Sequence, residues 1–299
     1  MNNNLKTGLS YGLCAYIMWG LLPIYWKQLN QVPSMEVLAN RFIWSVVFVF
    51  MLLALTRRLG IFLSETKAIF SSRATTLRIL SASALITVNW GLFIWAVETG
   101  HILDTSMGYY INPLVNVVFG MFFLGERLNK LQLTAVILAA IGISIMVVKN
   151  GSLPLTSLGL AVTFALYGLM KKKIVAQPLT SVMLETLIVS PGALLYLYYL
   201  ANHGGNAYQA GDGVTLLYLA GSGIATATPI ILFTACARML PLYMIGFMQY
   251  LAPTISFFLG VIMYKEAFTS AHAWSFGFIW CGLAFFIWST IRQIRGLES

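Results

Sequence analysis

Charged side chains are scarce in this sequence. Asp, Glu, Lys and Arg together make up 9% of the 299 residues, whereas a soluble domain has roughly 25%. So few charges cannot cover the water-facing surface of a chain of this length, which excludes an ordinary soluble globular protein. Hydrophobic residues instead make up 59% of the sequence, and the mean hydropathy is +0.82. The composition therefore predicts an integral membrane protein.

Cysteines and the motifs of enzymes are also few. The three cysteines, Cys14, Cys236 and Cys281, fall within apolar runs, which favours packing over disulfide or metal binding. Neither an HExxH zinc motif nor a glycine-rich phosphate loop is present. Gly221-Ser222-Gly223 only superficially resembles an intramembrane serine protease motif, because Ala220 stands where that motif has glycine. We expect no enzymatic activity, no cofactor and no metal ion.

Channels, sensors and nucleic-acid-binding proteins lack support as well. A channel would need a filter motif or a ring of like residues, and a sensor would need a soluble output domain; the sequence has neither. The net charge of +9 would suggest nucleic acid in a soluble protein, but here the basic residues lie in short loops between apolar runs. We expect no nucleic-acid partner, and the sequence does not predict an oligomeric state.

Ten apolar runs are long enough to cross about 30 Å of hydrocarbon as helices of about 20 residues. The sixth run is the weakest, because Lys171, Lys172 and Lys173 lie at its end. The first run lacks a small-residue cleavage site and is interpreted as a retained helix. We therefore expect an all-α integral membrane protein with ten transmembrane helices. The runs cover residues 9–26, 35–56, 76–97, 102–124, 131–149, 155–173, 181–201, 214–236, 240–264 and 272–291.

The basic residues predict how these helices are oriented. With the N-terminus in the cytoplasm, 14 of the 18 Lys and Arg residues fall in cytoplasmic segments. The outer loops hold only Lys27, Lys149 and Lys265, and Arg41 lies within a span. Because cytoplasmic loops carry an excess of Lys and Arg, we expect both termini to be cytoplasmic.

The two halves of the chain resemble each other. Four residues of the fourth span recur 140 residues later in the ninth, as the pairs Tyr110/Tyr250, Pro113/Pro253, Gly120/Gly260 and Glu126/Glu266. We therefore predict two five-helix repeats, residues 8–149 and 152–292. Because five is odd, the second repeat enters the membrane from the opposite side, an arrangement typical of secondary transporters.

Three stretches resemble one known family. The stretches GYYINPLV (108–115), FLGER (123–127) and NWGLFIWA (89–96) closely resemble the RarD proteins, which belong to the EamA group of the drug/metabolite transporter superfamily. The resemblance spans nearly the whole chain. It implies two EamA-type repeats, a location in the bacterial inner membrane and a permease role. RarD proteins are described as chloramphenicol-sensitivity proteins, but that label does not establish a substrate.

Two ionisable residues lie clearly within spans, where each costs roughly 2.5–3.5 kcal/mol on insertion scales. Arg41 lies near the outer end of the second span and Glu185 near the inner end of the seventh. Their levels differ by roughly 15 Å, which is too far for an ion pair. Arg41 could instead meet Glu98 or an anionic substrate, or snorkel to the interface. Glu185 could couple transport to protons, or pair with the lysines at 171–173.

Further candidate residues lie on other spans, above all the fourth and the ninth. Pro113 and Pro253 each free a backbone carbonyl and loosen their helix, which points to a substrate site there or to a packing kink alone. Polar side chains that could bind a ligand, or bond neighbouring helices, are Asn89, Asn112, Asn116, Thr228 and Gln249. Aromatic side chains that could line an apolar cavity, or serve only packing, are Trp19, Trp90, Tyr109, Tyr110 and Tyr250.

The sequence therefore predicts a transporter for a small organic metabolite or drug. Two inverted repeats would give alternating access to the two sides of the membrane, and proton-coupled export through Glu185 is a hypothesis. The expected partners are a small-molecule substrate and membrane lipid. A flippase for lipids or other amphiphiles is the alternative, because an amphiphile-binding cavity would serve both.

Overall fold

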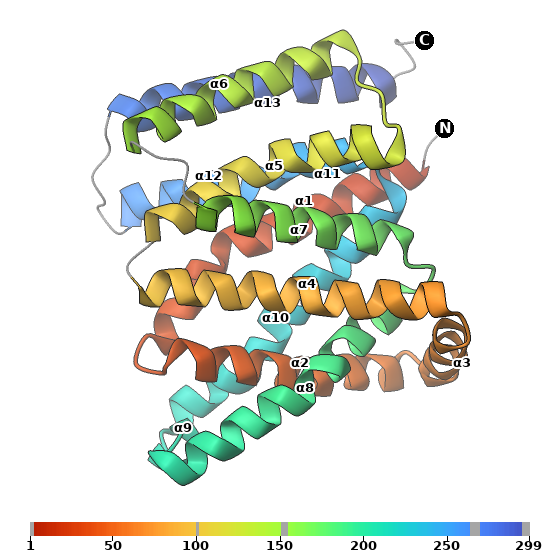
Figure 1. Cartoon of the computed structure of the whole chain (residues 1–299), viewed down its shortest axis with the longest axis vertical. Coiled ribbons are helices and arrows are strands. Elements are labelled where there is room, and N and C mark those ends of the chain that lie inside the picture. Colours follow the sequence, from red (N-terminus) through yellow and green to blue (C-terminus); the bar gives the residue numbers. More distant parts are fainter. Residues whose placement is uncertain (1–2, 100–101, 151–154, 264–269, 295–299) are drawn as a thin grey trace.

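The computed structural model describes residues 3–99, 102–150, 155–263 and 270–294, and all regular structure within these ranges is helical (Figure 1). Long helices lie across the view in stacked layers, and several are tilted against their neighbours. The helices of the first half are α1 (Asn3–Trp26), α2 (Ser34–Leu55), α3 (Leu59–Phe70), α4 (Arg73–Glu98), α5 (Ile102–Leu124) and α6 (Lys130–Asn150). A 3-10 turn, Lys27–Leu29, follows α1.

The second half repeats this order with one interruption. Its helices are α7 (Leu155–Lys173), α8 (Pro178–His203), α9 (Ala207–Ala210), α10 (Gly213–Met239), α11 (Leu242–Gln249), α12 (Leu251–Phe258) and α13 (Ser270–Ile294). A π-helical turn, Leu259–Met263, continues α12.

Eight of the described helices are long and apolar enough to cross a membrane, namely α1, α2, α4, α5, α6, α8, α10 and α13. These findings confirm an all-helical protein with several membrane spans. The sixth predicted span coincides with α7, whose last turn carries three lysines. The ninth coincides with α11 and α12, which form a shorter apolar segment, Leu242–Phe258.

The ninth predicted span, residues 240–264, which was expected to be loosened at Pro253, is divided into two helices. The chain leaves α11 at Gln249, turns at Tyr250 and starts α12 at Leu251. Pro253 explains the break, because it has no N–H to donate to the carbonyl of Gln249 and its ring crowds that carbonyl. Pro113, its counterpart, lies inside a continuous α5. The two prolines therefore have different effects on their helices.

A short helix that the sequence did not predict lies across the end of the bundle. Figure 1 shows α3 nearly end-on, at right angles to the long helices. Its inner side carries the buried Ile69, while Leu63 and Phe70 are exposed beside the basic residue Lys67. This pattern is typical of a helix that lies in the membrane interface.

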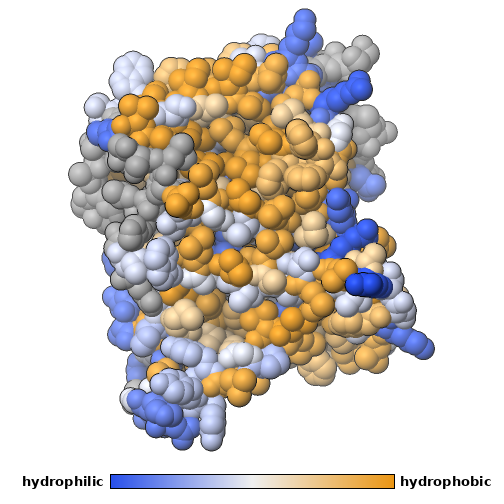
Figure 2. Space-filling view, in the orientation of Figure 1, coloured by the Kyte–Doolittle hydropathy of each residue, from blue (hydrophilic) through white to orange (hydrophobic). Residues whose placement is uncertain are grey.

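The outer surface of the bundle is an apolar band. Exposed large hydrophobic side chains are numerous on the long helices, with Phe122 at 85% exposed. Figure 2 shows these apolar residues across the middle, and hydrophilic residues along the right edge and at the lower left. The right edge is the side on which both termini and α3 lie in Figure 1. The predicted cytoplasmic segments therefore share one side of the bundle.

Helices of the first half pack mainly against helices of the second. In the first half, α2 contacts α8 and α10, α4 contacts α7 and α8, and α6 contacts α13. The contact of α1 with α10 matches that of α7 with α4 when the halves are exchanged, and α1–α12 likewise matches α7–α5. The contacts thus come in corresponding pairs.

One such pair of corresponding helices, α6 and α13, makes the same close backbone contact in both directions. A Cβ atom added to Gly142 would lie 2.6 Å from the carbonyl oxygen of Ser275. A Cβ atom added to Gly282 would lie 2.8 Å from the carbonyl oxygen of Ala135. Gly142 and Gly282 are separated by 140 residues, and so are Ala135 and Ser275. Each helix therefore presents the same glycine to the corresponding backbone oxygen of the other.

Candidate functional site

Arg41 lies where helices from both halves converge. Its Nε atom donates a hydrogen bond of 3.0 Å to Oγ1 of Thr226 on α10. Its guanidinium carbon lies 4.2 Å from the ring centre of Trp90 on α4 and 4.7 Å from that of Trp26 on α1. Tyr109 on α5 is near enough to interact electrostatically. A cation enclosed by two indole rings in this way is stabilised by their π-electrons.

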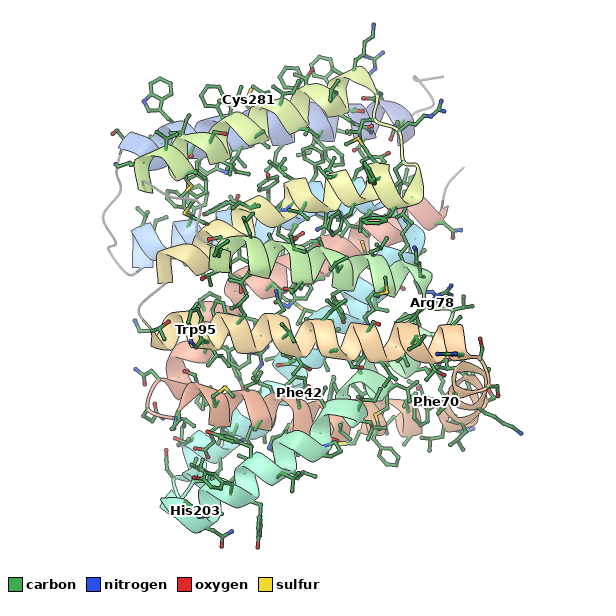
Figure 3. All side chains as sticks on the ribbon, viewed as in Figure 1. Phe42, Phe70, Arg78, Trp95, His203 and Cys281 are labelled. Atoms are coloured by element: carbon green, nitrogen blue, oxygen red, sulfur yellow. The ribbon has the colours of Figure 1, made fainter. Side chains whose placement is uncertain are left out.

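These side chains are interior but not sealed. Trp90 packs against three separate hydrophobic clusters of the bundle, and yet Arg41, Trp26 and Trp90 are each partly exposed. Figure 3 labels Phe42, the neighbour of Arg41 on α2, between α2 and α4, and its ring centre is 5.3 Å from that of Trp90. The site is thus held by packed aromatic rings, while Arg41 as a whole residue is only partly covered.

The predicted partner of Arg41 cannot be assessed, because the Glu98 side chain lies outside the described residues. Among the side chains that the structure describes, no carboxylate comes within 4.0 Å of Arg41. Glu185 has other partners, in agreement with the separation argued from span depths. Thr226 was not predicted as a site residue, whereas Thr228 was. The hydroxyl of Thr228 is buried without a hydrogen-bond partner in the described part of the chain.

Trp19 belongs to an aromatic cluster that joins α1, α7 and α10. Its ring centre is 5.3 Å from Tyr16, 5.9 Å from Phe164 and 5.6 Å from Phe233. Phe233 in turn stacks on Tyr167 at 6.0 Å. Trp19 is partly exposed, while Tyr16 and Tyr167 are buried. The cluster leads from the middle of the bundle toward Glu185, because Tyr167 contacts both.

The predicted amide residues form hydrogen bonds between helices. Asn112 donates to the carbonyl of Ala161 at 2.7 Å, and Asn116 donates to Asn112 at 2.9 Å and to Gln249 at 2.7 Å. These bonds join α5, α7 and α11 beside the break before α12. Asn89 makes equivalent bonds from α4, to the carbonyl of Leu160 and the hydroxyl of Thr163 on α7. The four amide side chains are buried, so in this conformation they connect helices.

The tyrosines of the motif helices differ from one another. Tyr109 is 49% exposed, whereas Tyr110 and Tyr250 are buried. Tyr110 packs edge-on against Phe276 of α13 at 5.4 Å. The Tyr250 hydroxyl, at the break between α11 and α12, has no hydrogen-bond partner in the described part of the chain. Of the three, Tyr109 is the one placed to contact a ligand directly.

Glu185 lies in a buried polar cluster at the ends of α7 and α8. Lys171 donates to its carboxylate at 2.5 Å, Ser181 at 2.8 Å and Tyr167 at 2.9 Å. Lys171 also donates to Ser181 at 3.0 Å. The side chains of Lys171 and Glu185 are 0% and 4% exposed. Sequence reasoning gave Glu185 a lysine partner as one alternative, but expected it at the membrane interface rather than in the interior.

Further polar contacts connect helices at the end of the bundle that holds the Glu185 cluster. The carboxylate of Glu126, after α5, accepts hydrogen bonds from the backbone N–H groups of Leu242 and Tyr243 at 2.7 and 3.0 Å. It thereby caps the start of α11, where a negative charge also suits the helix dipole. Arg238 donates to the carbonyl of Ala176. The Glu126 contacts tie the two halves together on the side of the termini, whereas the Arg238–Ala176 contact joins two segments of the second half.

A cavity of about 810 Å³ lies elsewhere, on the outside of the bundle. It is a shallow groove between α6 and α13, and several of its lining side chains, Ile137, Val148 and Trp274 among them, are strongly exposed. The predicted site residues do not line it. An outward-facing apolar groove of this kind is suited to lipid, so we place the functional site at Arg41 instead.

Taken together, the helical bundle with its apolar band and its enclosed polar sites defines a multi-pass membrane protein, and the comparisons with known proteins assign its class. Residues 6–148 match the EamA-like transporter family. The chain is 42% identical over 294 residues to an uncharacterized transporter of Bacillus subtilis, YojE, with 98% of both chains covered. It is 40% identical over 291 residues to the protein RarD of Escherichia coli, with 97% of both covered.

A third relative and a solved structure agree with this assignment. An uncharacterized transporter of Vibrio cholerae is 43% identical over 281 residues, which cover 94% of this chain and 92% of that one. The protein is thus a membrane transporter. It belongs to the EamA-like transporter family, among the RarD proteins. A crystal structure of an 18% identical protein has the same fold, with a TM-score of 0.72 over 94% of this chain and 96% of that one.

Proposed function

We propose that the protein is a secondary transporter of a small organic solute, a metabolite or drug, in the bacterial inner membrane. The observation that carries this proposal is the Arg41 site. It combines a partly exposed cation, two indole rings and groups from both halves of the chain. A site between two halves that can move against each other is what alternating access requires.

The proposed architecture is ten transmembrane helices in two inverted repeats, 8–149 and 152–292. The corresponding helix contacts of the two halves support it, and so do the reciprocal contacts of Gly142 and Gly282. Such reciprocity, in which each partner uses the same surface, is expected of a two-fold relation. The segments predicted to be cytoplasmic lie on one side of the bundle, which supports a cytoplasmic location for both termini.

Alternating access follows from where the halves are fastened. Glu126 ties them on the side of the termini, while Arg41 is partly exposed nearer the opposite side. The exchange of conformations would break these ties and close the helices around Arg41. The break between α11 and α12 supplies a flexible joint next to the Asn116–Gln249 bond.

Glu185 is the proposed coupling group. Protonation would remove its charge and weaken its bonds with Lys171 and Tyr167, which join α7 to α8. Proton binding would therefore loosen two helices at once. The variant Glu185→Gln leaves Lys171 without its counter-charge, so it is compared with the wild type at equal amounts of folded protein. It should lose solute movement driven by a pH gradient in proteoliposomes while keeping exchange of labelled for unlabelled solute. Asp212→Asn, which removes an exposed carboxylate but keeps a helix cap, is the control. Gradient-driven transport at the wild-type rate in Glu185→Gln would disprove the coupling role.

The alternative is a flippase for lipids or other amphiphiles, which the apolar groove between α6 and α13 favours. Two assays on one preparation of proteoliposomes distinguish the transporter from the flippase. Proteoliposomes are assayed for the flux of radiolabelled phenylacetate, phenylacetamide and chloramphenicol, and for scrambling of a fluorescent phospholipid. Saturable solute flux without scrambling supports the transporter. Scrambling at rates well above empty vesicles, with no solute flux, would replace it with the flippase.

A further inference from the structure

The guanidinium of Arg41 has unused hydrogen-bonding capacity. Its Nε atom donates to Thr226, but the two terminal nitrogens have no hydrogen-bond partner among the described residues. A guanidinium has five N–H donors, and an arginine within a membrane span costs roughly 2.5–3.5 kcal/mol on insertion scales. The indole rings of Trp26 and Trp90 lie beside the cation but supply no acceptor atom, so its terminal N–H groups form a free edge among the described residues. That free edge can accept a ligand in place of water.

The chemistry of the free edge selects an anion. Two parallel N–H groups on a rigid plane match the two oxygens of a carboxylate, whereas a neutral amide offers one carbonyl oxygen and a cation is repelled. No acidic side chain in the described part of the chain lies within ion-pair distance. Among the described residues the positive charge of the site is uncompensated, and a single negative charge would neutralise it. A dianion would leave a net negative charge in the same apolar surroundings.

The walls of the site select the rest of the molecule. Indole rings on α1 and α4 and the exposed Tyr109 on α5 offer flat apolar surfaces beside the cation. Flat rings pack against such surfaces by offset stacking or edge-to-face contact. We propose that the Arg41 site binds an organic monoanion whose carboxylate pairs with the guanidinium and whose flat apolar body lies against these aromatic side chains. This inference rests on the proposed transport function, and it names the class of the solute.

A matched set of three probes tests the charge requirement. Phenylacetate, phenylacetamide and phenethylamine share one ring and differ in charge. Binding to the full-length protein in detergent is measured by calorimetry and by thermal stabilisation. Because a hydrogen bond to a charged group contributes more than a neutral one, phenylacetate should bind at least about tenfold more tightly than phenylacetamide. Phenethylamine should bind more weakly than either. Equal binding of the acid and the amide, or preference for the amine, would overturn the proposal.

Variants then test whether Arg41 causes the preference. Arg41→Gln should remove the advantage of phenylacetate and leave phenylacetamide within about twofold. Arg41→Lys should keep part of the advantage, because it retains the charge but loses the planar fork. Arg73→Gln makes the matched change at an exposed position at the start of α4 and should change nothing. A full acid preference in a folded Arg41→Gln protein would overturn the proposal, and if that variant does not fold, Arg41→Lys and the wild-type probe set still decide it.

The binding experiments test the anion site separately from the proposed transport function. Arg41-dependent binding of phenylacetate supports the proposed anion site even when the proteoliposomes move no solute, which would count against the transporter alone. Transport of phenylacetamide but not of phenylacetate, with no acid preference in binding, would retain the transporter and reject the anion.

Discussion

The buried ion pair of Lys171 and Glu185 is the least expected feature at the scale of single residues. Both side chains are nearly inaccessible, and together with Ser181 and Tyr167 they satisfy the oxygens of one carboxylate. Burial of two charges is unfavourable unless each finds a partner, and the attraction between them often only offsets that desolvation. The pair therefore adds little net stability, but loss of one member leaves the other charge buried alone.

Lys171→Met should accordingly destabilise the protein strongly. The free energy of unfolding should fall by about 3–5 kcal/mol, because Glu185 keeps a buried charge without its cation. The double variant Lys171→Met/Glu185→Leu should recover most of the loss, since apolar residues of similar size often replace a buried pair without penalty. Unfolding of the purified protein in detergent, followed by circular dichroism, measures both. Lys67→Met at an exposed position on α3 is the control and should stay within about 0.5 kcal/mol. Wild-type stability of the single variant would contradict the argument.

Sequence reasoning found part of this chemistry and missed the rest. Arg41 and Glu185 stood out because charges within spans are rare, and each lies in a distinct polar site of the structure. Lys171 did not stand out, because at the end of an apolar run a lysine is the usual mark of the membrane interface. Thr226 was missed for a similar reason, since a hydroxyl in a span is usually bonded to its own helix. The partners depend on how the helices pack, which one sequence does not reveal.

At the scale of helices, the clearest difference between the two halves is that the ninth predicted span is divided into α11 and α12, whereas its counterpart α5 is one helix. Pro113 and Pro253 are counterparts in sequence, but α5 continues through its proline and the second helix breaks before its own. The broken joint lies beside Gln249, which accepts a hydrogen bond from Asn116 on α5. In the proposed mechanism, this joint would let α12 swing while α11 stays packed.

Pro253→Ala should stiffen this joint. Alanine restores an N–H that can bond the carbonyl of Gln249, so α11 and α12 should merge and the protein should gain about 1 kcal/mol or more in stability. Solute flux should fall several-fold while binding affinity stays unchanged, because the joint and not the site is altered. Pro191→Ala in the continuous α8, at an exposed position, is the matched control and should leave flux unchanged. Flux at the wild-type rate in Pro253→Ala would rule out a moving joint.

Hydropathy located the long helices well, because an apolar run of about 20 residues matches the thickness of the hydrocarbon core. It did not predict the break at Tyr250, since residues on both sides of the break are equally apolar. Pro253 predicted a loosened helix there, but Pro113 predicted the same for α5, which stays continuous. Hydropathy also did not predict α3, because 12 residues are too short to cross the hydrocarbon core. Both features depend on local backbone geometry and on the membrane interface rather than on hydrophobic length.

At the scale of the whole molecule, the basic residues and the packing of the halves point to the same orientation. Fourteen of 18 basic residues fall in segments that were predicted to be cytoplasmic, and both termini lie on one side of the bundle together with α3. The basic residues Arg57, Arg58 and Arg73 flank α3 on that side. Placing this side in the cytoplasm puts the cations against the anionic inner leaflet. It also means that Arg41 is accessible nearer the outer side.

Reporter fusions test this orientation directly. Green fluorescent protein fused after Ser299 should fluoresce and alkaline phosphatase at the same position should be inactive, because the C-terminus is expected in the cytoplasm. The reverse result is expected for insertions after Gly204, between α8 and α9, which the positive-inside rule places outside. Arg57, Arg58, Lys67 and Arg73 are a large part of the excess of basic residues in the predicted cytoplasmic segments. Replacing these four residues with Gln should weaken the preference for one orientation and yield a mixed signal at both positions. Fluorescence at Gly204 with phosphatase activity at the C-terminus would reverse the orientation, and the accessible side of the Arg41 site would then face the cytoplasm.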